Sequence, residues 1–76
     1  MPREVPREIH AEMVANVWKI VVVAGDSVAD GDTLLILESM KMEIPVLAER
    51  AGTVTEVAVT EGDVVQEGDI LVILEI

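Results

Sequence analysis

The sequence is short of several residue types, and each shortage excludes a class of protein. There is no cysteine, so disulfides and thiolate metal sites are excluded and the redox compartment cannot be read from the chain. There is no Phe or Tyr, and Trp18 is the one aromatic residue, although 51% of the 76 residues are hydrophobic. A core of Val, Ile, Leu, Met and Ala favours strands, because β-branched side chains pack well on a pleated surface.

Basic residues are also scarce. Five Lys and Arg stand against 15 Asp and Glu, which gives a net charge of −10. Nucleic acids and anionic membrane surfaces both select clustered positive charge, so neither is expected as a partner. The opening residues 1–8 are charged and interrupted by proline, and no apolar run is long enough to span a bilayer. The sequence therefore predicts a cytoplasmic protein.

An internal repeat organises the chain. When the sequence is shifted by 37 residues, Val17 falls on Val54 and the second half reproduces the pattern of the first. The repeated unit is a strand, then Gly-Asp-x-Val-x-x-Gly-Asp, then a second strand. The repeated turns are Gly25-Asp26 with Gly62-Asp63 and Gly31-Asp32 with Gly68-Asp69. Gly supplies positive φ and Asp caps its own turn, so these pairs punctuate strands.

Each half therefore predicts two main strands, at residues 17–23 and 33–38 and again at 54–60 and 70–75. No window has the length and period of an amphipathic helix. Two like halves predict an all-β flattened barrel or sandwich of two antiparallel sheets with a pseudo-two-fold axis, each sheet taking strands from both halves. We expect residues 1–10 to form a flexible segment and residues 11–76 to form the domain.

One lysine stands out by its place in the pattern. Lys41 lies between two methionines in the turn 39–42, which connects the strand ending at Glu38 to the stretch 43–47. A tight hairpin needs positive φ at both central residues and favours Asn-Gly or Asp-Gly, so Met-Lys is a poor local choice. A sequence that breaks a local rule at one point is a candidate for function there. The pseudo-two-fold axis also predicts that Lys41 lies at the pole away from the C-terminus.

A bland interpretation stands beside the functional one. Most loop lysines are only solvated, and most methionine pairs only fill a core. If Lys41 is acylated, a separate enzyme must bring the activated acyl group, because an amine attacks only in its neutral form and a free lysine is protonated at neutral pH.

Residues 38–42, Glu-Ser-Met-Lys-Met, resemble the attachment motif of biotinyl domains, in which a small residue precedes Met-Lys-Met. The resemblance covers residues 11–76, since 11–19 and 48–54 resemble the opening strands of the two halves of such domains. Lipoyl domains share the fold but usually carry Asp-Lys-Ala or Asp-Lys-Val, so the methionines favour biotin over lipoate. Biotinyl domains usually have Gly where Ala15 stands, which predicts a tight turn there. No insertion that would form a protruding thumb is present.

The resemblance implies a biotin carboxyl carrier with no catalytic residues of its own. A biotin protein ligase would join biotin covalently to Lys41, and the carrier would move carboxyl groups between a biotin carboxylase and a carboxyltransferase. Met40 and Met42 would be recognised together with the lysine. Glu38, Ser39 and Glu43 are weaker candidates for recognition.

Two alternatives stay open: a lipoyl-type acyl carrier, and a biotinyl-like assembly module whose Lys41 stays unmodified. The acceptor substrate, the oligomeric state and whether the chain is complete or a C-terminal piece also stay open, although the repeated Pro-Arg-Glu near Met1 favours a natural start. Neither His10 nor Trp18 is assigned a role. The aspartates of 26–32 do not match calcium-loop spacing, so no metal site is expected. Pro45 predicts an edge strand.

Overall fold

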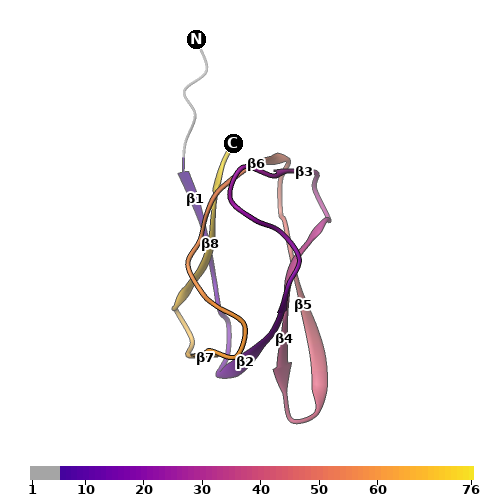
Figure 1. Ribbon diagram of the computed structural model, residues 1–76, viewed down its shortest axis with the longest axis vertical. Helices are drawn as coiled ribbons and strands as arrows, with labels where there is room; N and C mark the ends of the chain where they lie inside the picture. The colour runs from indigo at the N-terminus through magenta and orange to yellow at the C-terminus, as the bar shows by residue number, and fades with distance from the viewer. Residues whose placement is uncertain (1–5) are drawn as a thin grey trace.

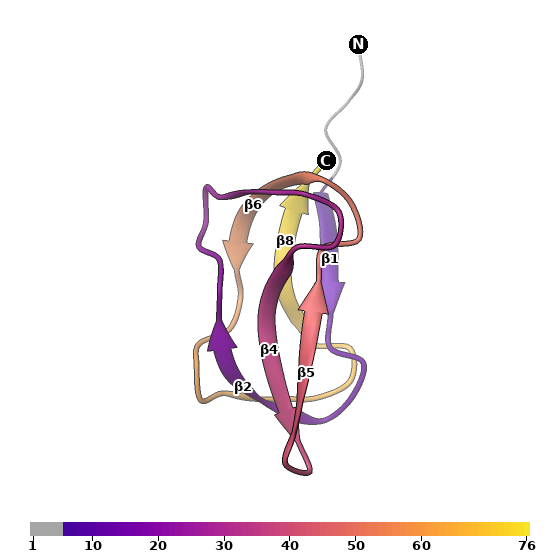
Figure 2. The same ribbon diagram turned by 90° about the vertical axis from the view of Figure 1, so that its right-hand side faces the viewer.

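The computed structural model describes residues 6–76, which form eight β-strands and no helix that could span a membrane. In chain order the strands are β1 (Pro6–His10), β2 (Ala15–Ile20), β3 (Ser27–Val28), β4 (Thr33–Ser39), β5 (Met42–Leu47), β6 (Gly52–Val57), β7 (Val64–Val65) and β8 (Ile70–Glu75). They make two antiparallel sheets with the orders β1-β8-β6-β3 and β5-β4-β2-β7 (Figures 1 and 2). The predicted all-β class is confirmed.

The hydrophobic core lies between the two sheets. Apolar residues that are less than a tenth exposed form one cluster: Ile9, Ala11, Ala15, Val17, Val22, Val28, Leu34, Leu35, Leu37, Ala48, Val54, Val65, Leu71, Val72 and Leu74. No polar or charged residue of the described range is buried. The core therefore stabilises the fold through burial of aliphatic area alone.

Bulges explain why two apolar runs do not alternate. The pairing of β4 with β5 skips from Thr33 to Leu35, and Leu34 and Leu35 are both fully buried. The pairing of β1 with β8 shifts at the equivalent place, where Leu71 and Val72 are both buried. A bulge inserts one residue into one strand of a pair, so two successive side chains can both face inward.

The predicted pseudo-two-fold relation extends to single hydrogen bonds. Asp26 accepts a bond from the backbone N–H of Val23 at 3.0 Å, and Asp63 accepts the same bond from Thr60 at 2.9 Å. Gly25 and Gly62, which open these turns, have φ of 100° and 95°, the region where glycine is favoured. The repeated Gly-Asp pairs are therefore turn residues, as the sequence predicted.

The start of the domain is corrected by the structure. The sequence predicts a domain that begins at Ala11, but Pro6–His10 forms β1 and pairs with β8. β1 is the two-fold mate of β5, and the 37-residue shift that places Ile9 on Val46 carries this signal. The sheet needs β1 because β8 would otherwise expose its backbone groups on that side. The remaining part of the segment predicted to be flexible, residues 1–5, lies outside the described residues.

Two further expectations concern strand ends. β2 ends at Ile20, before the predicted end at residue 23, and the N–H of Val23 bonds the Asp26 carboxylate in the following turn. Ala15 was expected in a tight turn but instead begins β2, buried and paired with Val65. Its mate Gly52 lies so close to β8 that an added Cβ would meet the backbone oxygen of Glu75 at 2.5 Å. The tight approach expected at Ala15 is therefore found at its mate Gly52, where the backbones of β6 and β8 lie close together.

The hairpin of β4 and β5 lies at one pole of the molecule, and the C-terminus lies at the other (Figure 1). This confirms the pole predicted for residue 41. β5 is the outermost strand of its sheet, as Pro45 predicted, since proline cannot donate a hydrogen bond to a second neighbour.

Candidate functional site

The tip of the β4–β5 hairpin is a two-residue turn. Ser39 pairs with Met42, which leaves Met40 and Lys41 as the two central residues. Their φ angles are 52° and 63°, and they are the non-glycine residues with positive φ in the described range. Each such residue costs about 1–2 kcal/mol relative to a right-handed conformation. The structure therefore has Met-Lys at the two positions where a tight hairpin turn favours Asn-Gly or Asp-Gly.

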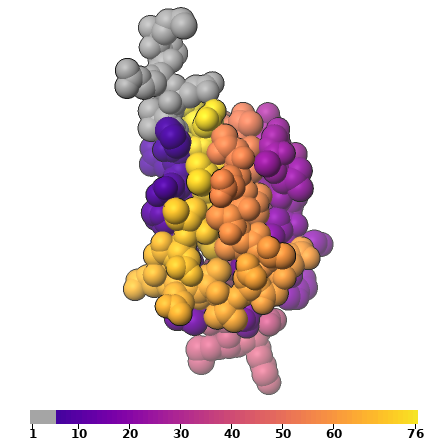
Figure 3. Space-filling model, turned by 60° about the vertical axis from the view of Figure 1, so that its left-hand side comes forward, coloured from indigo at the N-terminus to yellow at the C-terminus, as the bar shows by residue number. Residues whose placement is uncertain are grey.

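This turn holds the lysine away from the rest of the molecule. The hairpin tip projects past the body of the domain, below the segment of residues 60–70 (Figure 3). Lys41 is exposed and forms no ion pair or hydrogen bond with any described residue. Its amine is thus open to an enzyme from most directions.

The two methionines that flank the lysine are also exposed. Met40 is 91% exposed and Met42 is 66% exposed, so neither fills the core. The alternative in which these residues are core filler is excluded by this exposure. Large apolar side chains held in water beside a reactive amine are a surface that a partner can cover.

Like charges meet at the base of the hairpin. Glu38 on β4 pairs directly with Glu43 on β5, and Glu43 is exposed while Glu38 is half-buried. Two carboxylates opposite one another in a sheet destabilise the pair. The structure thus brings together the predicted site residues around Lys41, including the half-buried Ser39.

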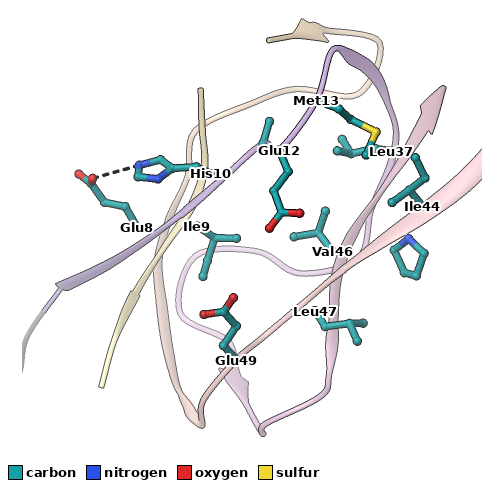
Figure 4. Close-up of a pocket in the computed structure, with 12 residues that line it drawn as sticks. Glu8, Ile9, His10, Glu12, Met13, Leu37, Ile44, Val46, Leu47 and Glu49 are labelled. Carbon is teal, nitrogen blue, oxygen red and sulfur yellow. Dashed lines mark hydrogen bonds and ion pairs between the residues drawn. The ribbon is translucent and has the colours of Figure 1, made fainter. Parts of the chain in front are cut away.

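A groove of about 520 Å³ lies elsewhere, between the edge strands β1 and β5. Its walls are apolar at Ile9, Ile44 and Val46, and the side chains of Glu12 and Glu49 project into it (Figure 4). It contains no lysine, serine or threonine that could form a covalent bond to a cofactor. The groove is therefore not the attachment site, although its lower end reaches the base of the hairpin.

His10 lies on β1 rather than in a flexible segment, and Trp18 lies on β2. The ring of His10 lies 3.3 Å from the carboxylate of Glu8, and both side chains are half exposed. Trp18 is 48% exposed on β2. No group of three or more metal-ligating side chains occurs within residues 6–76.

The fold and the site define a class: a small two-fold β-domain that presents one strained, unpaired lysine at a hairpin tip. A family model described as biotin-requiring enzyme matches residues 4–74. The chain belongs to this family, which confirms the resemblance seen in the sequence.

Three known proteins show the relation in detail. The biotinylated protein TB7.3 homolog of Mycolicibacterium smegmatis is 61% identical over 41 residues, which cover 54% of this chain and 58% of that protein. The urea carboxylase of Kluyveromyces lactis superposes on 97% of this chain and 6% of its own, with 31% identity and a TM-score of 0.86. The lipoyl domain of the 2-oxoglutarate dehydrogenase complex of Azotobacter vinelandii covers 80% of this chain and 77% of its own, with 30% identity and a TM-score of 0.71.

These relations support covalent biotin as the attached group and a carrier rather than a catalytic role for the domain. The geometry of the hairpin fits that group, because an unhindered primary amine is what an amide link to a carboxylic acid needs. The matched segment spans little more than half the length of the curated relative.

Proposed function

We propose that the protein is a biotin carboxyl carrier whose Lys41 is joined to biotin by a biotin protein ligase. The observation that carries this proposal is the strained turn: two adjacent residues with positive φ, Met40 and Lys41, hold an unpaired amine at the far pole. A fold that needed only a connection would gain stability from Asn-Gly at these positions.

The attachment step needs an enzyme, because no described residue lies against the lysine amine as a base. The ligase first uses ATP to join the carboxyl group of biotin to AMP. An amide bond then forms between Nζ of Lys41 and the carboxyl carbon of biotin, while the bond from that carbon to the phosphate oxygen breaks and AMP leaves. The proton lost from the amine passes to a group of the ligase or to solvent. In the bond-forming step itself, this chain contributes the positioned nucleophile.

Recognition at the tip falls to the neighbours of the lysine. Met40 and Met42 offer exposed, adaptable apolar surface on both sides of the amine. Glu38 and Glu43 add a paired negative charge at the base, which a cationic surface of a partner would neutralise. Ser39 lies beside Met42 and leaves room for a partner's approach because it is small.

The domain's part in carboxyl transfer is tethering. Bound biotin supplies a ring nitrogen that holds a carboxyl group. The protein keeps this group on a long arm at the end of a hairpin, which raises its effective concentration at the active sites of a biotin carboxylase and a carboxyltransferase. The rigid two-sheet body holds the arm clear of its own surface. We also propose the cytoplasm as its compartment, as the sequence predicted.

Carboxyl loading tests this function. The protein is first treated with ligase, biotin and ATP, and then incubated with a biotin carboxylase, ATP and labelled bicarbonate. We expect acid-labile label on the wild-type protein and none on Lys41→Arg. A wild-type protein that takes up biotin but never acquires label would contradict the carrier role.

The lipoyl alternative predicts a different product at the same lysine. The lipoyl-domain neighbour shows that the fold serves both groups, so the test must offer both. In parallel reactions with a biotin ligase and a lipoate ligase, we expect modification in the first only. Modification in the second alone would make the lipoyl carrier the correct interpretation, and modification in neither would favour the assembly module.

A further inference from the structure

Because of the two-fold repeat, each surface residue in one half of the chain can be compared with the residue at the equivalent position of the other half. Trp18 lies in the bulge of β2, where Val17 pairs with Leu37 and Lys19 pairs with Ile36. Thr55 lies in the matching bulge of β6, where the equivalent pairings recur. Both side chains are exposed. Because the backbone is the same at both places, a difference in side chain is not required by the fold.

The side chains at equivalent positions differ between the two sheets. The outer face of the sheet β5-β4-β2-β7 carries Trp18, Lys19 and Val64, which we call the lysine face because this sheet extends into the hairpin. The equivalent positions on the other sheet are Thr55, Glu56 and Ser27, which we call the mate face. An indole, a cation and a valine on one side thus replace two hydroxyl side chains and an anion on the other.

The apolar members of the lysine face are held in water. Trp18 is 48% exposed and Val64 is 66% exposed. Tryptophan is one of the residue types enriched among the side chains that contribute most binding energy in protein interfaces. The mate face shows that the same strand pairing accommodates polar side chains, so the indole and the valine are not required by the local fold.

The lysine face continues directly to the modified residue. Val64 pairs with Asn16, Asn16 with Glu38, and Glu38 with Glu43, so one row crosses the sheet at the base of the hairpin. Trp18 lies two residues from this row on one side and the turn lies two residues away on the other. At about 3.3 Å per residue along the strand and about 4.8 Å between neighbouring strands, Trp18 is roughly 15 Å from the tip.

This distance falls inside the area that an acting enzyme must cover. A typical protein–protein contact takes about 800 Å² of each partner, which corresponds to a disc of about 16 Å radius. We propose that the ligase which acylates Lys41 docks on the lysine face, with Trp18 and Val64 packed against its apolar surface and Lys19 opposite an acidic group. This inference rests on the proposed function and names the docking surface for it.

Kinetics of biotin transfer to the unmodified protein test the proposal. We expect Trp18→Thr combined with Val64→Ser, which installs the residues of the mate face, to lower kcat/KM for the protein substrate about tenfold. The loss should lie in KM, with kcat unchanged and complete modification of Lys41 at long times. Thr55→Ala combined with Ser27→Ala, on the mate face, should leave kcat/KM unchanged.

A transposed variant separates docking from general hydrophobicity. Trp18→Thr with Thr55→Trp keeps the composition of the chain and moves the indole to the mate face. We expect its kcat/KM to fall as it does for Trp18→Thr alone, with an unfolding midpoint like that of the wild type.

Four results would overturn the inference in distinguishable ways. Unchanged kcat/KM in the lysine-face variant, with normal biotin uptake by the wild type, would overturn the docking surface alone. The same holds if the transposed variant regains the wild-type value. A wild-type dimer in sedimentation that Trp18→Thr dissociates, with unchanged kinetics, would assign the face to a second copy. A wild-type protein that takes up no biotin would overturn the proposed function, and the inference with it.

Discussion

The two central residues of the hairpin turn have an unfavourable backbone conformation. Met40 and Lys41 both have positive φ, in a turn that strongly prefers Asn-Gly. Neither side chain gains a contact in return: Lys41 has no partner among the described residues, and Met40 is almost fully exposed. The turn is therefore less stable than the fold allows, which supports our proposal that its residues serve a partner.

Relief of this strain gives the first prediction. Met40→Asn combined with Lys41→Gly should raise the free energy of unfolding by about 1–2 kcal/mol, because both residues tolerate the left-handed region. Urea unfolding followed by circular dichroism measures the change. As a control, Lys19→Gly places glycine within β2 and should lower stability by about 0.5–1 kcal/mol. A double turn variant no more stable than wild type would show that the turn is unstrained.

Among the elements of the fold, the four main strands could be predicted from the internal repeat. The 37-residue shift located β2, β4, β6 and β8, because each is an apolar run bounded by a Gly-Asp turn. β1 was missed, since Pro6–His10 is mostly polar and exposed and its one buried side chain, Ile9, gives a weak pattern. Pairing with β8 rather than local propensity makes this segment a strand.

The residues of the site also differ in whether the sequence alone could predict them. The turn lysine and its flanking methionines could be predicted because local sequence breaks a local rule there. The lysine face could not, because Trp18, Lys19 and Val64 are brought onto one sheet by long-range pairing. The comparison of mates that identifies this face also requires knowing which strands share a sheet and which side chains are exposed.

The contact of β6 with β8 gives an element-scale prediction. Gly52→Ala places a Cβ 2.5 Å from the backbone oxygen of Glu75, so one of the two strands must move. We expect a loss of about 1–3 kcal/mol in the free energy of unfolding. The exposed neighbour Thr53→Ala should change stability by less than about 0.5 kcal/mol. Equal unfolding midpoints for the two variants would show that the strands can separate without cost.

At the scale of the whole molecule, neither half has a fold of its own. β1 and β3 pair only with strands of the second half, and β5 and β7 pair only with strands of the first. Cutting the chain after Lys41 would leave each fragment one antiparallel pair, β2 with β4 or β6 with β8. An isolated pair of strands is marginally stable in water at best.

Fragments test this interleaving. Peptides of residues 1–41 and 42–76 should each lack a cooperative thermal transition, and an equimolar mixture should regain the spectrum of the intact chain. Circular dichroism and amide hydrogen exchange report both states. A fragment that melts cooperatively alone would mean that one half contains a sufficient core.

Attachment of biotin to Lys41 is tested by the intact mass of the protein after reaction with a biotin protein ligase. The chain supplies its own control, because Lys19 and Lys41 are its two lysines and both are exposed. We predict that the wild type and Lys19→Arg each gain one biotinoyl group, mapped to the Lys41 peptide, and that Lys41→Arg gains none. Biotin on Lys19, or a wild-type mass that an active ligase leaves unchanged, would contradict the central claim.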